Sequence, residues 1–245
     1  MTEQQLQHSI NDYWTRRAPA YDAYQQRPER RDLDLEVWRG IWSAALPAAP
    51  ADVLDVGTGS GHVARLVAGL GHRVTGIDLS PGMLEIAAGD AASDATSDAT
   101  SDVTSDVTPP RFLAGDAVDP DFAEQSFDAV VGRYVMWTLR DPETAVARWV
   151  RLLRPGGVVA MADSLWFTDG LGELYGERPE GHLPLADARS IEEVADALRR
   201  GGLVDVAVTP LEQVRELDRA HGVAPGHEVV LQYLLTGCRP LTPAD

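Results

Sequence analysis

Residues 53–61 read Val-Leu-Asp-Val-Gly-Thr-Gly-Ser-Gly, a short apolar strand that runs directly into three glycines. Residues 60–70 then repeat apolar side chains at helical spacing. Glycines in such a turn permit positive φ angles and let a ligand approach the main chain. The free N–H groups that begin the following helix add positive potential. This strand–turn–helix unit predicts a ligand site at the carboxyl ends of the strands of an open α/β sheet.

Strand and helix patterns alternate around this unit. We expect strands at 51–56, 73–77, 111–114, 127–131, 158–162, 203–208 and 228–235, with helices at 60–70, 81–89, 142–153 and 190–200. Such alternation predicts an α/β fold with a mostly parallel sheet and helices on both faces. No clear long helix pattern separates the last two strands, which leaves an antiparallel pairing open at one edge.

One domain over residues 1–245 is the simplest organisation for a chain of this length. Residues 1–50 look helical and carry Tyr13, Trp14, Tyr21 and Tyr24. Residues 93–108 repeat a four-residue Ser-Asp-(Ala/Val)-Thr unit, a composition typical of a flexible surface insertion. Residues 163–189 are rich in glycine and proline and are expected to form a loop or short-helix insertion near the strand ends.

Composition excludes several classes of function. The net charge is −17, which disfavours nucleic acid as a partner. All 21 basic residues are arginine, so no lysine is present for Schiff-base chemistry or a phosphate loop. A single cysteine, Cys238, excludes an internal disulfide and a thiolate metal cluster. Without an apolar run of membrane length or a secretory N-terminus, we expect a cytoplasmic protein with no membrane association.

Further acidic residues indicate what the glycine turn binds. Asp78 ends the second strand, 21 residues after Gly57, where its carboxylate can hold the two hydroxyls of a ribose. Asp55 precedes the glycines and is expected either to face a cationic amino group or to hold the loop. Asp116-Ala117 follows the third strand, in position to meet an adenine ring. These features alone leave a nicotinamide dinucleotide open, because Gly59-x-Gly61-x-x-Ala64 also fits that fingerprint.

Taken together, the motifs resemble the class I S-adenosylmethionine-dependent methyltransferases, of the type that acts on small molecules in bacteria. The resemblance rests on residues 53–61, Asp78, residues 115–117, the Arg-Pro-Gly-Gly turn at 154–157 and the aromatic segment 13–22. It implies a Rossmann-like seven-stranded sheet of order 3-2-1-4-5-7-6, strand seven being antiparallel, with an N-terminal helical lid over residues 1–50. It also implies S-adenosylmethionine as the cofactor. Residues 163–189 then lie on the substrate side.

The resemblance implies the residues that hold this cofactor. They are Tyr13, Tyr21, Asp55, Gly57, Thr58, Gly59, Gly61, Asp78, Leu79, Met83, Gly115, Asp116, Ala117 and Arg133. Arg133 and Tyr134 follow the fourth strand, where cofactor and acceptor meet in this family. The sequence lacks the Asn-Pro-Pro-aromatic motif of amide and adenine N-methyltransferases and the acidic metal cluster of catechol-type enzymes, and no spacing indicates a metal site.

The implied reaction is methyl transfer to an oxygen, nitrogen or carbon atom of a small molecule or peptide, by in-line displacement in a desolvated pocket. A bacterial secondary metabolite or related small molecule is the expected acceptor. The alternatives are an NAD-dependent oxidoreductase and a non-catalytic cofactor-binding subunit. The chain is expected to be a monomer or homodimer. No catalytic base stands out; the candidates are His182, His221, His227 and Tyr134, whereas His62 and His72 are expected to face solvent.

Overall fold

The computed structural model describes residues 2–97, 108–167, 170–171, 175, 182–224 and 227–241. A seven-stranded sheet of order β3-β2-β1-β4-β5-β7-β6 forms its centre. The strands are β1 (Asp52–Val56), β2 (Arg73–Asp78), β3 (Arg111–Ala114), β4 (Phe127–Arg133), β5 (Leu153–Ser164), β6 (Val204–Pro210) and β7 (Gln232–Cys238). Strands β1 to β5 pair in parallel, and β7 pairs antiparallel with both β5 and β6. The predicted strand order and the antiparallel seventh strand are therefore confirmed.

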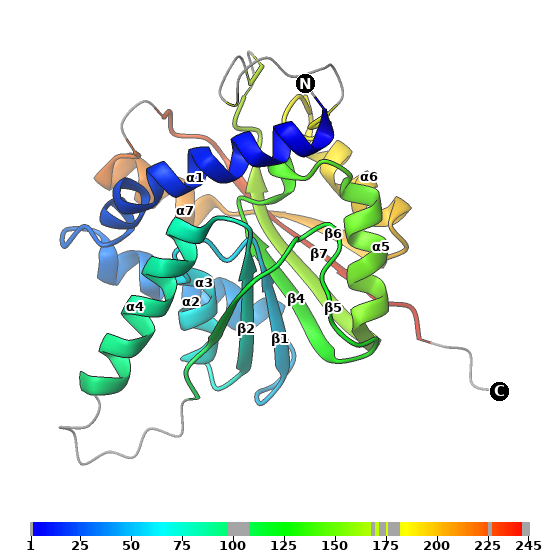
Figure 1. Ribbon diagram of the computed structural model, residues 1–245, viewed down its shortest axis with the longest axis horizontal. Helices are drawn as coiled ribbons and strands as arrows, with labels where there is room; N and C mark the ends of the chain where they lie inside the picture. The colour runs from blue at the N-terminus through cyan, green and yellow to red at the C-terminus, as the bar shows by residue number, and fades with distance from the viewer. Residues whose placement is uncertain are drawn as a thin grey trace.

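Helices cover both faces of this sheet (Figure 1). Apolar side chains of α5 (Pro142–Leu152) and α6 (Ile191–Arg200) join one buried cluster with the sheet, around Leu54, Val130 and Trp149. Those of α2 (Arg31–Ala45), α3 (His62–Ala68) and α7 (Glu212–His221) join a second cluster, around Trp38 and Val67. Burial on both faces explains the nearly continuous apolar runs of the central strands.

The helix α1 (Glu3–Gln25) crosses the edge of the sheet where the parallel strands end (Figure 1). Leu6 and Ile10 on its inner side pack against Trp137 and Tyr175. Thr15 packs on α4 (Pro81–Ser97), with its hydroxyl 3.0 Å from that of Ser80. The N-terminal helical segment thus covers the ends of the strands, as the sequence indicated.

Two sequence predictions about helices are wrong. The helix α4 runs through Ser97, so the first residues of the four-residue repeat form its last turn and are not part of a loop. Most of the rest of the repeat lies outside the described residues, as does much of the 163–189 segment. In addition, α7 occupies residues Glu212–His221 between the last two strands, where no helix was expected. Among the described helices, none combines the length and the apolar composition that a bilayer crossing requires.

Candidate cofactor and acceptor site

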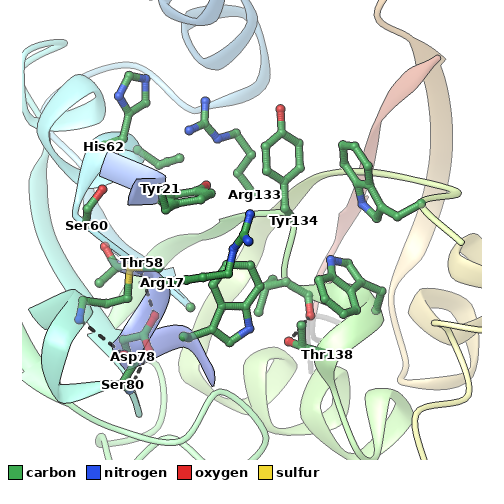
Figure 2. Close-up of a pocket in the computed structure, with 18 of the residues that line it drawn as sticks. Arg17, Tyr21, Thr58, Ser60, His62, Asp78, Ser80, Arg133, Tyr134 and Thr138 are labelled. Carbon is green, nitrogen blue, oxygen red and sulfur yellow. Dashed lines mark hydrogen bonds between the residues drawn. The ribbon is translucent and has the colours of Figure 1, made fainter. Parts of the chain in front are cut away.

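A cavity of about 760 Å³ lies under α1, at the carboxyl ends of β1, β2 and β4. The predicted residues that line it are Tyr13, Tyr21, Gly57, Thr58, Gly59, Asp78, Leu79, Met83, Gly115, Asp116, Ala117, Arg133, Tyr134 and His227. Figure 2 shows Asp78 and Ser80 in one part of the cavity and Arg133 and Tyr134 in another, with Arg17 between them in this view. The structure therefore gathers fourteen separate sequence positions around one space, in the position expected for an open α/β sheet.

The glycine loop takes the backbone shape that its sequence predicts. Gly57, Gly59 and Gly61 have φ angles of +64°, +55° and +83°, which residues other than glycine rarely adopt. A Cβ on Gly59 would meet only the Met83 sulfur, at 3.8 Å, whereas a Cβ on Gly57 would lie 2.5 Å from Val135. The main chain at Gly59 is thus accessible from the cavity. The absence of a side chain at Gly57 and Gly61 lets the loop pack closely against neighbouring residues.

Asp78 fixes this loop from the neighbouring strand. Its carboxylate accepts the backbone N–H of Gly59 at 2.8 Å with one oxygen and that of Ser80 at 2.8 Å with the other. Burial raises the pKa of Asp78, and these N–H donors oppose the increase. Because a carboxylate oxygen can accept more than one hydrogen bond, Asp78 still offers acceptor positions to hydroxyl groups in the cavity.

Asp55 lies behind the loop and does not line the cavity. Its carboxylate accepts the Thr58 hydroxyl at 2.6 Å, and its side chain is buried. Burial raises the pKa of Asp55 to about 7, although the Thr58 hydrogen bond and the charge of Arg133 oppose the increase. Of the two roles that the sequence left open for Asp55, these contacts fit the one that holds the loop.

Asp116 and Ala117 line the same cavity after β3. Asp116 accepts the Val118 backbone N–H at 2.9 Å and forms an ion pair with Arg140. The carbonyl of Ala117 accepts the indole N–H of Trp149 at 2.8 Å. These contacts fix the segment 115–118 in place. Arg140 is a partner that the sequence gave no reason to select.

The part of the cavity away from Asp78 is aromatic. Tyr134 contacts Trp166 edge to face, with ring centroids 4.9 Å apart, and its ring also meets Trp38. The Arg133 guanidinium carbon lies 5.0 Å from the centroids of both Trp38 and Tyr134. The side chains that make up this aromatic wall are Trp14, Tyr21, Trp38, Tyr134, Trp137, Trp166 and Phe167.

Histidines are distributed differently from the prediction. His62 lines the cavity and is largely buried, and burial lowers its pKa well below the usual value. His72 is also buried. The expectation that both face solvent is therefore wrong. His227 lines the cavity as well, and partial burial together with the charge of Arg17 lowers its pKa. His182, His221 and Gly61 do not line the cavity, and no cluster of metal-ligand side chains occurs in the described ranges.

Comparison with known proteins agrees with this geometry. Residues 54–161 match the methyltransferase domain family. The chain is 32% identical over 127 residues to a demethylmenaquinone methyltransferase of Renibacterium salmoninarum, covering 51% of this chain and 47% of that protein. It is also 32% identical over 149 residues to a ubiquinone biosynthesis O-methyltransferase of Xanthomonas oryzae, covering 60% and 54%. Over this region the chain is similar to S-adenosylmethionine-dependent methyltransferases, in agreement with the resemblance that its motifs indicated.

The comparisons support S-adenosylmethionine as the cofactor, rather than the nicotinamide dinucleotide that the glycine motif also left open. A solved S-adenosylmethionine-dependent methyltransferase of Thermotoga maritima has the same fold, with a TM-score of 0.62, 19% identity, and coverage of 94% of this chain and 99% of that one. The chain spans about half the length of the relatives named above.

Sequence patterns did not reveal the polar residues that lie beneath the aromatic wall. Arg30, Asp34, Asp218 and Gln232 all line the cavity, and all four are buried. Arg30 directly precedes α2, and the other three come from α2, α7 and β7, which lie far apart in the sequence. Charged residues on a helix usually face solvent, so the sequence contained no signal for their burial.

Proposed function

We propose that this methyltransferase transfers the methyl group of S-adenosylmethionine to a hydroxyl oxygen, or another nucleophilic atom, of a small aromatic molecule. One observation carries the proposal: a single cavity of about 760 Å³ joins the glycine loop and Asp78 to the aromatic wall. A site that only bound the cofactor would have no use for a second, aromatic compartment.

The residues around the glycine loop fit the cofactor. The main chain at Gly59 has room above it for a ligand, and the Asp78 carboxylate can accept from two ribose hydroxyls. We propose that Leu79, Met83, Gly115, Asp116 and Ala117 hold the adenine part, and that Tyr13, Tyr21, Thr58 and Arg133 flank the methionine part. In this proposal Asp55 and Gly61 support the loop from behind.

The bound cofactor supplies a methyl group on a positively charged sulfur. The chain's contribution is to align the acceptor atom with that methyl group and to keep water away from it. The aromatic wall and the covering helix α1 suit both tasks. Exclusion of water favours a reaction in which charge is lost, because neither reactant is then stabilised by hydration.

A proton acceptor is needed only where the acceptor atom does not lose its proton readily. Burial raises the pKa of the Tyr134 hydroxyl, which keeps it protonated and makes it unsuitable as a base. His227 lines the cavity with a lowered pKa, so its ring is neutral near pH 7 and can accept a proton. We propose His227 as the general base for acceptors that need one.

The acceptor class is supported by two independent observations. Tryptophan and tyrosine side chains form the wall, and they bind flat apolar rings well. The relatives carry names that refer to demethylmenaquinone and to ubiquinone biosynthesis, both of which concern quinones. We therefore propose a hydroxylated ring of quinone type, or a related small molecule, as the acceptor.

Titration of the chain with S-adenosylhomocysteine, followed by calorimetry, tests the cofactor part of the proposal. The wild type should bind, and Asp78→Ala should lose most of the affinity while Asp119→Ala keeps it, since Asp119 is exposed and paired with Arg148. Incubation with S-adenosylmethionine and a panel of hydroxylated naphthalenes, with mass-spectrometric detection of S-adenosylhomocysteine, tests the activity. Binding of NADH in place of S-adenosylhomocysteine, or binding that is unchanged in Asp78→Ala, would refute the proposal.

A further inference from the structure

Tyr134 is the cavity end of a hydrogen-bonded chain that runs into the protein. Its hydroxyl lies 2.7 Å from the Gln232 Oε1, and the Gln232 Nε2 lies 3.1 Å from the Asp218 carboxylate. Asp218 in turn pairs with Arg30 at 2.6 Å. The residue that follows β4, the first residue of β7 and a residue of α7 thus meet in one polar line beneath the aromatic wall.

A buried arginine pairs with the carboxylate at the far end of this hydrogen-bonded chain. Burial raises the pKa of Asp218, and the contact with Arg30 opposes that increase. Arg30 binds both carboxylate oxygens of Asp34, at 2.9 and 3.0 Å, and one oxygen of Asp218. It also donates to the Gly222 carbonyl at 2.8 Å. The side chains of Arg30, Asp34 and Asp218 are only 5–7% exposed. Charge-assisted contacts of this kind fix the position of the Asp218 carboxylate.

The Asp218 carboxylate determines which atom is the donor in each hydrogen bond between Asp218, Gln232 and Tyr134. A carboxylate can only accept hydrogen bonds, so the group of Gln232 that faces Asp218 must be its NH₂. The Gln232 oxygen therefore faces Tyr134, and the Tyr134 hydroxyl must donate its single proton to that oxygen. Toward the cavity the same hydroxyl has only lone pairs to offer.

Tyr134 also has a backbone conformation that is rare for residues other than glycine. Its φ angle is +64°, in the left-handed region that favours glycine, and its N–H donates to the Ala162 carbonyl at 2.8 Å. Trp38 and Trp166 contact its ring from two sides. A strained residue that its surroundings fix this firmly points to a role in ligand recognition.

We propose that the Tyr134 oxygen accepts a hydrogen bond from an O–H or N–H group of the methyl acceptor, and that Gln232, held by Asp218, sets this preference. The inference rests on the proposed function and narrows it to acceptors with a donor near the reacting atom. A ligand whose hydroxyl hydrogen is replaced by methyl cannot form this bond. The site therefore distinguishes an acceptor that carries this donor from the same molecule in which methyl replaces the donor hydrogen.

A matched pair of probes, 2-naphthol and its methyl ether, tests the preference by equilibrium dialysis in the presence of S-adenosylhomocysteine. The wild type should bind the naphthol roughly fivefold or more tightly than the ether, the size expected for one neutral hydrogen bond. In Tyr134→Phe this ratio should fall to about 1, because the accepting oxygen is gone.

Gln232→Leu should change the affinity for the methyl ether rather than for the naphthol. The Tyr134 hydroxyl then has no internal acceptor and can turn its proton toward the cavity, so the ether should bind more tightly than it does to the wild type. Gln213→Leu, an exposed position on α7, is the matched control and should behave as the wild type. Should Gln232→Leu fail to fold, the Tyr134→Phe ratio decides the test by itself.

Two results would overturn the inference: no naphthol preference in the wild type, or a preference that is unchanged in Tyr134→Phe. If S-adenosylhomocysteine still binds in that case, only the role of Tyr134 is refuted. If the wild type binds no S-adenosylhomocysteine, the proposed function fails and this inference fails with it.

Discussion

The backbone N–H of Gly59 donates to the Asp78 carboxylate at 2.8 Å, which ties the loop after β1 to the last residue of β2. The other oxygen of Asp78 accepts the Ser80 N–H at the same distance. One side chain thus holds the glycine loop, caps the turn before α4 and faces the cavity. A structural role and the proposed ligand-binding role therefore coincide at Asp78.

Asp78→Asn should lower the affinity for S-adenosylhomocysteine about 10- to 100-fold. The amide keeps the size of the side chain but places an NH₂ where an oxygen now accepts, and hydrogen bonds to a charged group contribute about 1.5–3 kcal/mol. Calorimetric titration measures the change. Asp119→Asn is the control, and an affinity for Asp78→Asn within twofold of the wild type would contradict the assignment.

Gly57→Ala should destabilise the fold by about 2–4 kcal/mol. The new Cβ would lie 2.5 Å from Val135 on a residue with a φ of +64°, so crowding adds to backbone strain. Gly40→Ala, in the middle of α2 with open space around it, should instead stabilise by about 0.5–1 kcal/mol. Urea unfolding of both variants checks the contrast in sign, and equal effects would show that the loop is not constrained as described.

Asp55→Asn should gain unfolding free energy relative to the wild type as the pH rises. Burial raises the pKa of Asp55 from 3.8 to about 7, so the folded state holds the proton more tightly than the unfolded chain does. The contribution of Asp55 to the free energy of unfolding is therefore fully present below about pH 4 and is lost as the pH rises toward 7. An asparagine does not titrate and avoids this loss.

The difference in unfolding free energy between Asp55→Asn and the wild type should grow, in favour of the variant, by on the order of a few kcal/mol from pH 4.5 to 7.5. Urea titrations at both pH values measure it. Asp119→Asn should show no comparable trend, because Asp119 is exposed. A difference for Asp55→Asn that stays constant with pH would rule out the raised pKa.

Arg30→Met should destabilise the protein by about 3–5 kcal/mol at pH 7, because it leaves Asp34 and Asp218 buried without a cation. The loss should shrink at acidic pH, because burial raises the pKa of Asp218 and protonation of this carboxyl removes one of the unpaired charges. Thermal or urea unfolding at pH 7 and pH 4.5 measures both effects. Arg39→Met, at an exposed position of the α2 helix that follows Arg30, is the control and should cost less than about 0.5 kcal/mol.

Much of the fold was accessible from the sequence because local signals agreed. The glycine loop needed positive φ angles, Asp78 closed the second strand, and apolar runs marked the buried strands. The confirmed strand order came from resemblance to a family, since periodicity does not determine which strands are neighbours.

The helix α7 was missed because its buried face is short and partly charged. Only Val214, Leu217 and Asp218 are buried among its ten residues, so it lacks a clear apolar stripe. The same reason hid the acceptor side of the cavity. Asp218 and Gln232 have no local pattern. Asp218 pairs with Arg30, which is about 190 residues away in the chain, and Gln232 donates to Asp218.

The antiparallel direction of β7 affects how specificity for the methyl acceptor can change between related proteins. Its first residue, Gln232, reaches the cavity, whereas the parallel strands contribute through their last residues. The residues proposed to hold the nucleoside all lie between Gly57 and Ala117, whereas part of the opposite side, such as Trp38 and Gln232, comes from segments nearer the two ends of the chain. Exchange of the terminal portions between homologous enzymes could retarget them to new acceptors while nucleoside affinity is inherited unchanged.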